Sequence, residues 1–179
     1  MPKKRSRLFS WLNEWTEQEK QGTLTDIFVA GDAGAPMLRL EQVACLPGQG
    51  LEGDRYAAGR GHWIKTDGCE VTLVSRADIE RATRRGEQSF LNGEHRRNLV
   101  VEGIALDVYR RQAVMIGDVL FRFHRLRPPC GYLDRLLQPG AGKALGKGAG
   151  IGLHVISAGV IRVGDAVRVL TDANVASVR

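Results

Sequence analysis

The stretch VTLVSRADIERATRR, residues 71–85, sets the pattern from which the fold class is inferred. Its first four residues form a short apolar, β-branched run, which is typical of a buried strand. Ser75, with Asp78 three residues later, has the pattern of a helix N-cap, so a helix is predicted to start here and to stop at Gly86. Another short strand is predicted over residues 98–101.

Short strand-like segments flank this stretch on both sides. They lie at residues 24–29, 37–45, 119–123, 153–156 and 166–170. A further short helix is predicted over 130–137, and the Gly-rich segment 140–150 is predicted to be a mobile loop. Because strands do not alternate regularly with helices, a doubly wound parallel sheet is disfavoured. The sequence therefore predicts a mainly β fold, a closed β-barrel of short mixed strands with a few appended short helices.

The length and composition are those of one globular domain. The chain has 179 residues, of which 43% are hydrophobic and 26% charged, and domains usually run about 100–200 residues. Residues 1–22 are predicted to form a basic tail and an amphipathic helix, because Leu8, Trp11, Leu12 and Trp15 follow helical spacing. Residues 23–170 are predicted to form the barrel, with 171–179 as a C-terminal tail. The tryptophan stripe suggests a homodimer as one expectation.

Charge and cysteine usage exclude several classes of protein. The formal net charge is +6, but much of it comes from the first seven residues, so no nucleic-acid partner is expected. No apolar run approaches the roughly 18 residues that a membrane helix needs, and no secretory signal is recognised. The three cysteines are too scattered for a disulfide framework. These features predict a cytoplasmic protein without a membrane span.

Two polar segments are not explained by local structure alone. GLEGDRY, residues 50–56, places charged residues between glycines, as expected where backbone must approach something closely, and His62 follows it. Arg96, Arg97 and Asn98 lead directly into an apolar strand. Because guanidinium groups bind phosphate or carboxylate in a bidentate manner, the two arginines at the start of this strand are a candidate anion site.

A third segment places Cys130 at the start of a predicted helix, behind two prolines. Helix N-terminal amides and the nearby Arg127 would favour its thiolate form. An isolated cysteine is nevertheless more often a small buried apolar residue, so the residues alone leave a reactive and a structural Cys130 open. Cys45 and Cys69 lack this basic, helix-start context and are predicted to be structural.

In chain order, the segments GLEGDRY, GH, EVTLVSRADIE, RRNLVVEG, GDVLFRF, PPCGYL and GVIRVGDAVRV resemble the MOSC domain. This is the C-terminal domain of molybdenum-cofactor sulfurases, and it also occurs as free-standing bacterial proteins. The resemblance runs from about Thr23 to Leu170, and the chain looks like a free-standing member. It implies a β-barrel and a pterin-bound molybdenum cofactor, held stably or only transiently, or a sulfur carried on the family cysteine. The family is also associated with pyridoxal phosphate.

The resemblance assigns roles to residues by their position in these motifs. Cys130 matches the family cysteine and would be the catalytic residue, either as persulfide carrier or as molybdenum ligand. The residues that match the cofactor pocket are Asp54, Arg55, His62, Arg96, Arg97, Asn98 and Arg127.

Three functions stay open at this point. Cys130 would take sulfur from a donor protein and pass it to an acceptor. Alternatively, the protein would reduce N-hydroxylated compounds at molybdenum with a separate electron-donor reductase, since the chain has no iron–sulfur cysteine set. A third reading is a non-catalytic module that binds an anionic ligand.

Overall fold

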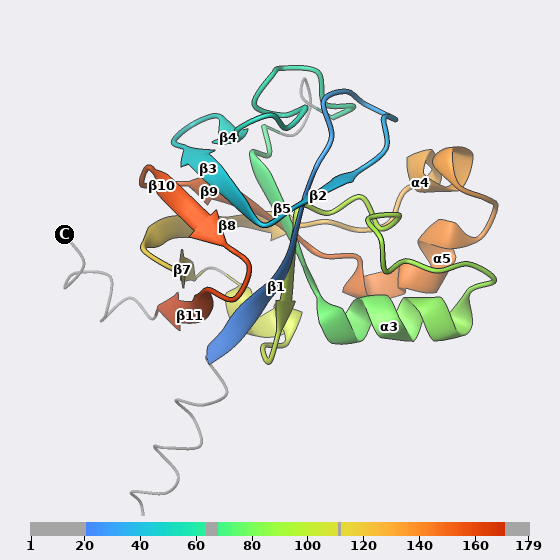
Figure 1. Cartoon of the computed structure of the whole chain (residues 1–179). Helices are drawn as coiled ribbons and strands as arrows, with labels where there is room; N and C mark the ends of the chain where they lie inside the picture. The colour runs from blue at the N-terminus through green and yellow to red at the C-terminus, as the bar shows by residue number, and fades with distance from the viewer. Residues whose placement is uncertain (1–20, 64–67, 111, 171–179) are drawn as a thin grey trace, which may run out of the picture.

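The computed structural model describes residues 21–63, 68–110 and 112–170, and these ranges form a mainly β fold (Figure 1). Within them, seven strands close a barrel, which confirms the predicted fold class. Around the barrel the strands are β1 (Gln21–Val29), β11 (Ala166–Leu170), β7 (Ala113–Ile116), β8 (Val119–Leu126), β9 (Ile151–Val155), β5 (Val71–Ser75) and β6 (Leu99–Glu102). The barrel is mixed, because β5 and β6 pair in parallel and the other neighbours pair antiparallel.

Strand β1 makes the closure possible because it is long enough to pair with several strands. Its first three residues pair with β11, its centre pairs with β6 across a bulge, and its last three residues pair with β2 (Leu38–Leu40). Gly22 lies against β6, where an added Cβ would be 2.3 Å from the Glu102 carbonyl oxygen. The strand thus begins two residues before the predicted domain boundary, and the rest of the predicted N-terminal helix and both tails lie outside the described residues.

A second, three-stranded sheet covers one side of the barrel. It contains β10 (Gly159–Arg162), β3 (Gln42–Leu46) and β4 (Gly50–Leu51), in that order. The strand predicted over 37–45 is therefore divided at Glu41: the part before it stays with β1 and the part after it pairs with β10. Apolar alternation runs through both parts, so the sequence pattern did not reveal the change of sheet.

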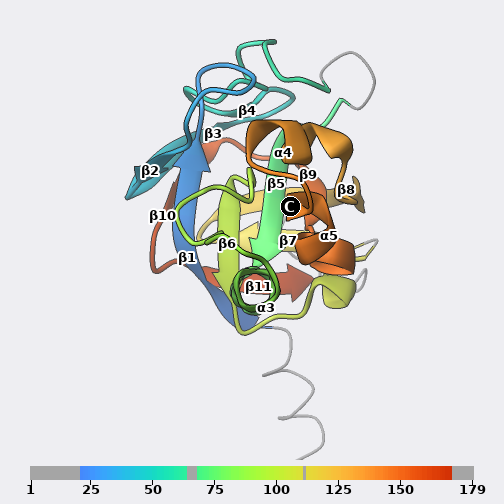
Figure 2. The same ribbon diagram turned by 90° about the vertical axis from the view of Figure 1, so that its right-hand side faces the viewer.

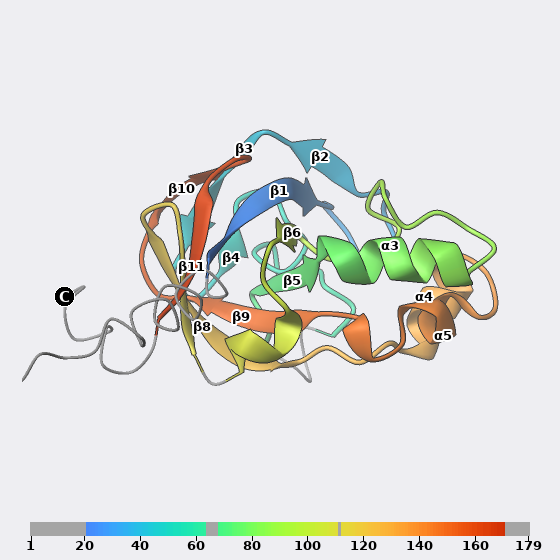
Figure 3. The ribbon, with the colours of Figure 1, turned by 90° about the horizontal axis from the view of Figure 1, so that it is seen from below.

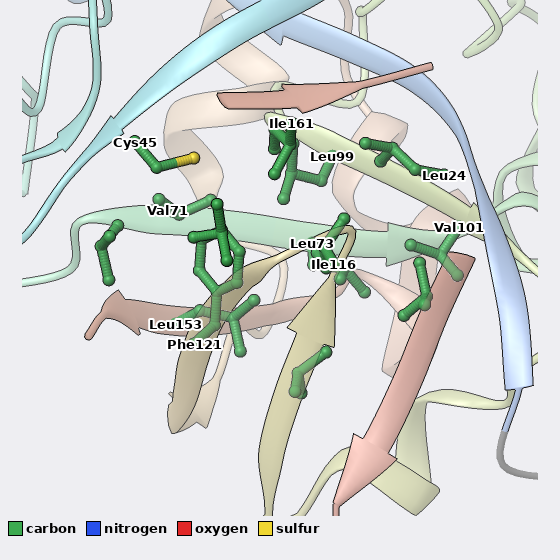
Figure 4. Close-up of a cluster of buried hydrophobic side chains, with 14 of the residues drawn as sticks. Leu24, Cys45, Val71, Leu73, Leu99, Val101, Ile116, Phe121, Leu153 and Ile161 are labelled. Atoms are coloured by element: carbon green, nitrogen blue, oxygen red, sulfur yellow. The ribbon is translucent and has the colours of Figure 1, made fainter. Parts of the chain in front are cut away.

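The barrel interior is filled by branched aliphatic side chains. Figure 4 shows residues from β1, β5, β6, β8 and β9 pointing toward one another, with Cys45 of β3 beside them. The fully buried members include Leu24, Val71, Leu73, Leu99, Val101, Ile116, Phe121 and Leu153. This is a packed core, so a ligand site must lie outside the barrel centre.

The helices gather on one side of the barrel (Figures 1 and 2). They are α3 (Arg76–Arg85), α4 (Gly131–Leu136), α5 (Ala141–Leu145) and the 3₁₀ helix Gly146–Gly148, whereas the 3₁₀ helix Leu106–Tyr109 follows β6 and lies apart from them (Figure 3). Helix α3 has the predicted bounds, from the N-cap Ser75 to Gly86. Seen from below, α3, α4 and α5 lie at the end of the molecule opposite β10 and β11 (Figure 3).

The segment 140–150 corrects the sequence analysis. It was predicted to be a mobile loop, but it contains α5 and a 3₁₀ helix. Ala141 and Leu145 are buried against Ile79 and Phe90 in a second apolar cluster. Two apolar residues four positions apart were enough to anchor one helical turn, despite the surrounding glycines.

Within the described ranges, no helix has the length and apolar character needed to cross a membrane.

Candidate functional site

A cavity of about 340 Å³ lies where the β4–β5 connection, the turn before β6 and the β8–α4 connection meet. Its walls come from segments that are far apart in the sequence but adjacent across strands β5, β6, β8 and β9. The lining residues include Arg55, Tyr56, His62, Thr72, Arg96, Arg97, Arg125, Arg127, Cys130 and Tyr132.

The cavity wall is strongly basic. Five arginines line it, and none of the described lining residues is an aspartate or glutamate. Burial lowers the pKa of Arg96, Arg97 and Arg127, because it removes water from their charged groups. An anion in the cavity would restore part of the lost solvation and favour the charged guanidinium groups.

Arg55 is held in place by a buried carboxylate. Asp54 is fully buried, and its Oδ2 accepts a hydrogen bond from Arg55 Nη1 at 3.1 Å and another from the Ala30 amide at 3.2 Å. Its Oδ1 accepts from the Tyr56 amide at 3.1 Å. Arg55 Nη2 in turn donates to the Arg96 carbonyl oxygen at 3.2 Å. The Asp54–Arg55 pair thus links the first polar segment to the second.

Asn98 completes this buried network. Its Nδ2 donates to Asp54 Oδ2 at 2.9 Å and to the Phe28 carbonyl oxygen at 3.0 Å. Its Oδ1 accepts from the Thr72 amide at 3.1 Å and from Thr72 Oγ1 at 2.8 Å. All four side-chain hydrogen-bonding positions of the amide are used inside the protein. Asn98 therefore stands behind the cavity wall and fixes the start of β6.

The two neighbouring arginines are each tied to a backbone carbonyl. Arg96 Nη1 donates to the Ala35 carbonyl oxygen, and Arg97 Nε donates to that of Ala149 at 2.5 Å. Gly150 makes the second contact possible, because a Cβ there would meet the Leu73 carbonyl oxygen at 2.6 Å and Arg97 Nε at 3.2 Å. Each guanidinium keeps further N–H groups that can bind a ligand.

Cys130 is the thiol that faces this cavity. It is partly buried, lines the cavity and serves as the N-cap residue of α4. Arg97 and Arg127 lie close enough that a thiolate on Cys130 raises the pKa of both. A negative charge at this position would therefore offset part of the effect of burial on both guanidinium groups.

The other two cysteines are buried away from solvent, and burial raises the pKa of Cys45 to about 12 and of Cys69 to about 11. Both remain protonated thiols through neutral pH. We expect iodoacetamide at about pH 8 to alkylate Cys130 in the native protein and to spare the other two. Peptide mass spectrometry of native and urea-denatured samples measures this. Equal alkylation of all three cysteines in the native protein would contradict it.

Aromatic rings surround the opening of the cavity. The His62 ring stacks on Tyr132, with centroids 3.7 Å apart and an interplanar angle of 5°, and Trp63 packs edge-on against His62. Tyr56 lies deeper, and its hydroxyl is 3.5 Å from Arg127 Nη2. Gly61 leaves room for this ring, because an added Cβ would lie 2.6 Å from it.

Six of the eight residues assigned by resemblance line the cavity. They are Arg55, His62, Arg96, Arg97, Arg127 and Cys130. Asp54 and Asn98 lie directly behind them and hold them in place. Sequence reasoning missed Tyr56, Thr72, Arg125 and Tyr132. Two of these lie inside the motifs GLEGDRY and PPCGYL, so a motif-wide reading of aromatic residues would have found them.

The cavity of this mainly β barrel thus brings together a partly exposed thiol and a cluster of arginines. The family model of the MOSC domain matches residues 61–168, and the chain belongs to the MOSC domain family.

Solved structures support the same fold. The YuaD protein from Bacillus subtilis is 15% identical with a TM-score of 0.69, and the match covers 83% of this chain and 95% of that one. YiiM from Geobacillus stearothermophilus is 17% identical with a TM-score of 0.66, over 84% and 75% of the two chains. YiiM from Escherichia coli is 18% identical with a TM-score of 0.60, over 83% and 70%. No curated protein sequence matches the chain.

Proposed function

We propose that the cavity binds the molybdenum cofactor, with the arginine wall around its phosphate and Cys130 at its metal. The observation that carries this proposal is the convergence of one thiol and five arginines on a single cavity whose described lining holds no carboxylate. An anionic ligand whose metal centre accepts a thiolate matches both parts of that wall.

The donor set fits a metal that arrives with its own ligands. Among the described residues, no group of three or more His, Cys, Asp or Glu side chains could hold a bare metal ion. Cys130 alone offers one soft ligand, which suits a metal already coordinated by an organic cofactor. When bound, such a cofactor supplies a centre that can change oxidation state, and the residues of this chain bind and orient it.

The phosphate end is assigned to Arg96 and Arg97. Both guanidinium groups are partly buried, both line the cavity and both are fixed by backbone carbonyls. Fixed, partly desolvated guanidinium groups lose little freedom on binding a phosphate, so their charge-assisted hydrogen bonds contribute strongly. The stacked rings of His62 and Tyr132 beside them are suited to the flat pterin.

The direct test is the composition of the purified protein. Wild-type protein made in a host that synthesises the cofactor is expected to contain molybdenum and pterin at comparable molar amounts. Metal analysis and fluorescence of the oxidised pterin measure both. Protein that carries neither from such a host, and takes up neither when mixed with free cofactor, would contradict the proposal.

Removing both guanidinium groups tests the phosphate assignment. The Arg96→Ala/Arg97→Ala double variant is expected to bind inorganic phosphate at least about a hundredfold more weakly, since each charge-assisted hydrogen bond contributes about 1.5–3 kcal/mol. Its unfolding free energy should fall by about 3 kcal/mol, because two hydrogen bonds from guanidinium groups to carbonyls are lost. Calorimetric titration and urea unfolding measure the two quantities.

Arg84→Ala is the matched control, because Arg84 is exposed on α3 and outside the cavity lining. This variant should keep the wild-type phosphate affinity. If the double variant binds phosphate as tightly as wild type does, Arg96 and Arg97 do not form the phosphate site.

Sulfur transfer by Cys130 is the second candidate, and it is favoured by the partial exposure of this thiol beside Arg97 and Arg127. The Cys130 thiolate would attack the outer sulfur of a donor persulfide, and the donor cysteine would leave as thiolate. An acceptor nucleophile would then take that sulfur from the Cys130 persulfide, and Cys130 would leave as thiolate. Intact-mass analysis after incubation with a persulfide donor tests this, since the product is one sulfur atom heavier.

Pyridoxal phosphate fits the cavity less well. Its phosphate could use the arginines, but none of the described lining residues is a lysine that could supply the amine for a Schiff base.

A further inference from the structure

His95 lies directly behind the turn that carries Arg96 and Arg97, and sequence analysis did not single it out. Its side chain is fully buried and packs edge-on against Phe28, with ring centroids 5.4 Å apart. Its Nδ1 accepts a hydrogen bond from the Arg97 amide at 2.9 Å. This contact joins a buried ring to the backbone of a cavity-lining arginine.

The turn itself is strained at Arg96. Its φ is +61°, and among the described residues it is the one non-glycine residue with positive φ. A Cβ makes this left-handed conformation costly, so surrounding contacts must hold it. The Arg96 amide donates to the Gly93 carbonyl oxygen at 2.8 Å, and the Arg96 carbonyl accepts from Arg55. The Arg97 amide, held by His95, fixes the far side of the same residue.

We propose that His95 is a positioning residue for the anion site: by accepting the Arg97 amide hydrogen, its Nδ1 keeps Arg96 in the left-handed conformation and so directs both guanidinium groups into the cavity. This proposal rests on the proposed binding of an anion there.

The state of the ring agrees with an acceptor role. Since Nδ1 accepts, the ring proton is on Nε2, which is buried and has no hydrogen-bond partner among the described residues. Burial, together with Arg97, Arg76 and Arg96, lowers the pKa of His95 to about 3, so the ring stays neutral at physiological pH. An apolar side chain would fill this space without leaving an N–H unpaired. The Nδ1 acceptor is the property that explains a histidine at this position.

Two amide variants distinguish the effect of an acceptor at the position of Nδ1 from the effect of a polar side chain as such. In His95→Asn the side-chain oxygen can occupy the place of Nδ1, whereas in His95→Gln it is one bond farther out. We measure the affinity for inorganic phosphate by calorimetry and the exchange rate of the Arg97 amide hydrogen by NMR. The second readout does not depend on any ligand.

His95→Asn should stay within about twofold of wild type in both measurements. His95→Gln should bind phosphate about five- to tenfold more weakly, the value of one net hydrogen bond, and should exchange the Arg97 amide hydrogen faster by at least the same factor. If wild type binds no phosphate, anion binding fails, while the exchange rates still decide whether His95 holds the turn.

Unchanged phosphate affinity and unchanged exchange in His95→Gln would overturn the proposal. If that variant does not fold, His95→Phe replaces it, because phenylalanine keeps the ring and lacks the acceptor. If neither His95→Gln nor His95→Phe folds while His95→Asn does, the proposal is also overturned. The acceptor would then be needed for folding of the whole domain, and its role would not be to orient the arginines.

Discussion

Replacing Cys130 by serine is expected to remove nearly all molybdenum from the purified protein while phosphate binding in the cavity persists. A serine hydroxyl is not ionised at neutral pH, so it replaces a thiolate poorly as a metal ligand. Arg96 and Arg97 are untouched, and the phosphate affinity should stay within about threefold of wild type, a difference below 1 kcal/mol. Metal analysis and calorimetry on the same preparation measure both.

The fold should tolerate this change. Cys130 is partly buried, and its side chain makes no hydrogen bond that caps α4, so the unfolding free energy should change by about 0.5 kcal/mol or less. Cys45→Ala is the matched control, because that thiol lies in the barrel core and should not affect metal content. If Cys130→Ser retains the molybdenum content of wild type, Cys130 is not a ligand of the metal.

The largest effect on stability is expected from Asp54→Ala. Asp54 is fully buried and accepts hydrogen bonds from Ala30, Arg55, Tyr56 and Asn98. Its removal leaves the Arg55 charge buried without its partner, which typically costs about 3–5 kcal/mol. Urea unfolding monitored by tryptophan fluorescence and circular dichroism measures this loss.

A double variant separates the charge from the hydrogen bonds. Asp54→Ala/Arg55→Met removes both charges and keeps much of the arginine volume, so it should regain about 1–3 kcal/mol relative to Asp54→Ala. A loss below about 1 kcal/mol in the single variant would mean that Arg55 finds another partner.

Much of the fold could be predicted from the sequence because local signals agreed with the tertiary structure. Helix α3 starts after Ser75 and ends before Gly86, as the sequence predicts, although the Ser75 side chain makes no capping hydrogen bond. The segment 37–45 shows where local reading fails: alternation fixes which face is buried but does not say which sheet the strand joins. The short strand β7 was missed, because its four apolar residues resemble many buried segments.

The candidate site could be predicted to the level of segments. Cys130 and the adjacent pair Arg96 and Arg97 were identified from their unusual local context, and the structure brings all three into one cavity. The division between residues that line the cavity and residues that support it, such as Asp54 and Asn98, depends on burial and on partners far away in the sequence. His95 was missed for the same reason, because its partner is a backbone amide that sequence reading does not evaluate.

The closure of the barrel between β1 and β11 has a consequence for the order of folding. The register pairs Gln21 with Arg168, so the first described strand meets the last one. Contacts between such distant positions form slowly, because much of the chain must be ordered before they stabilise it. During synthesis the seam stays open until Leu170 has left the ribosome, and β1 exposes an unpaired edge until then. Nascent chains that stop short of β11 are therefore expected to be prone to aggregation and to proteolysis.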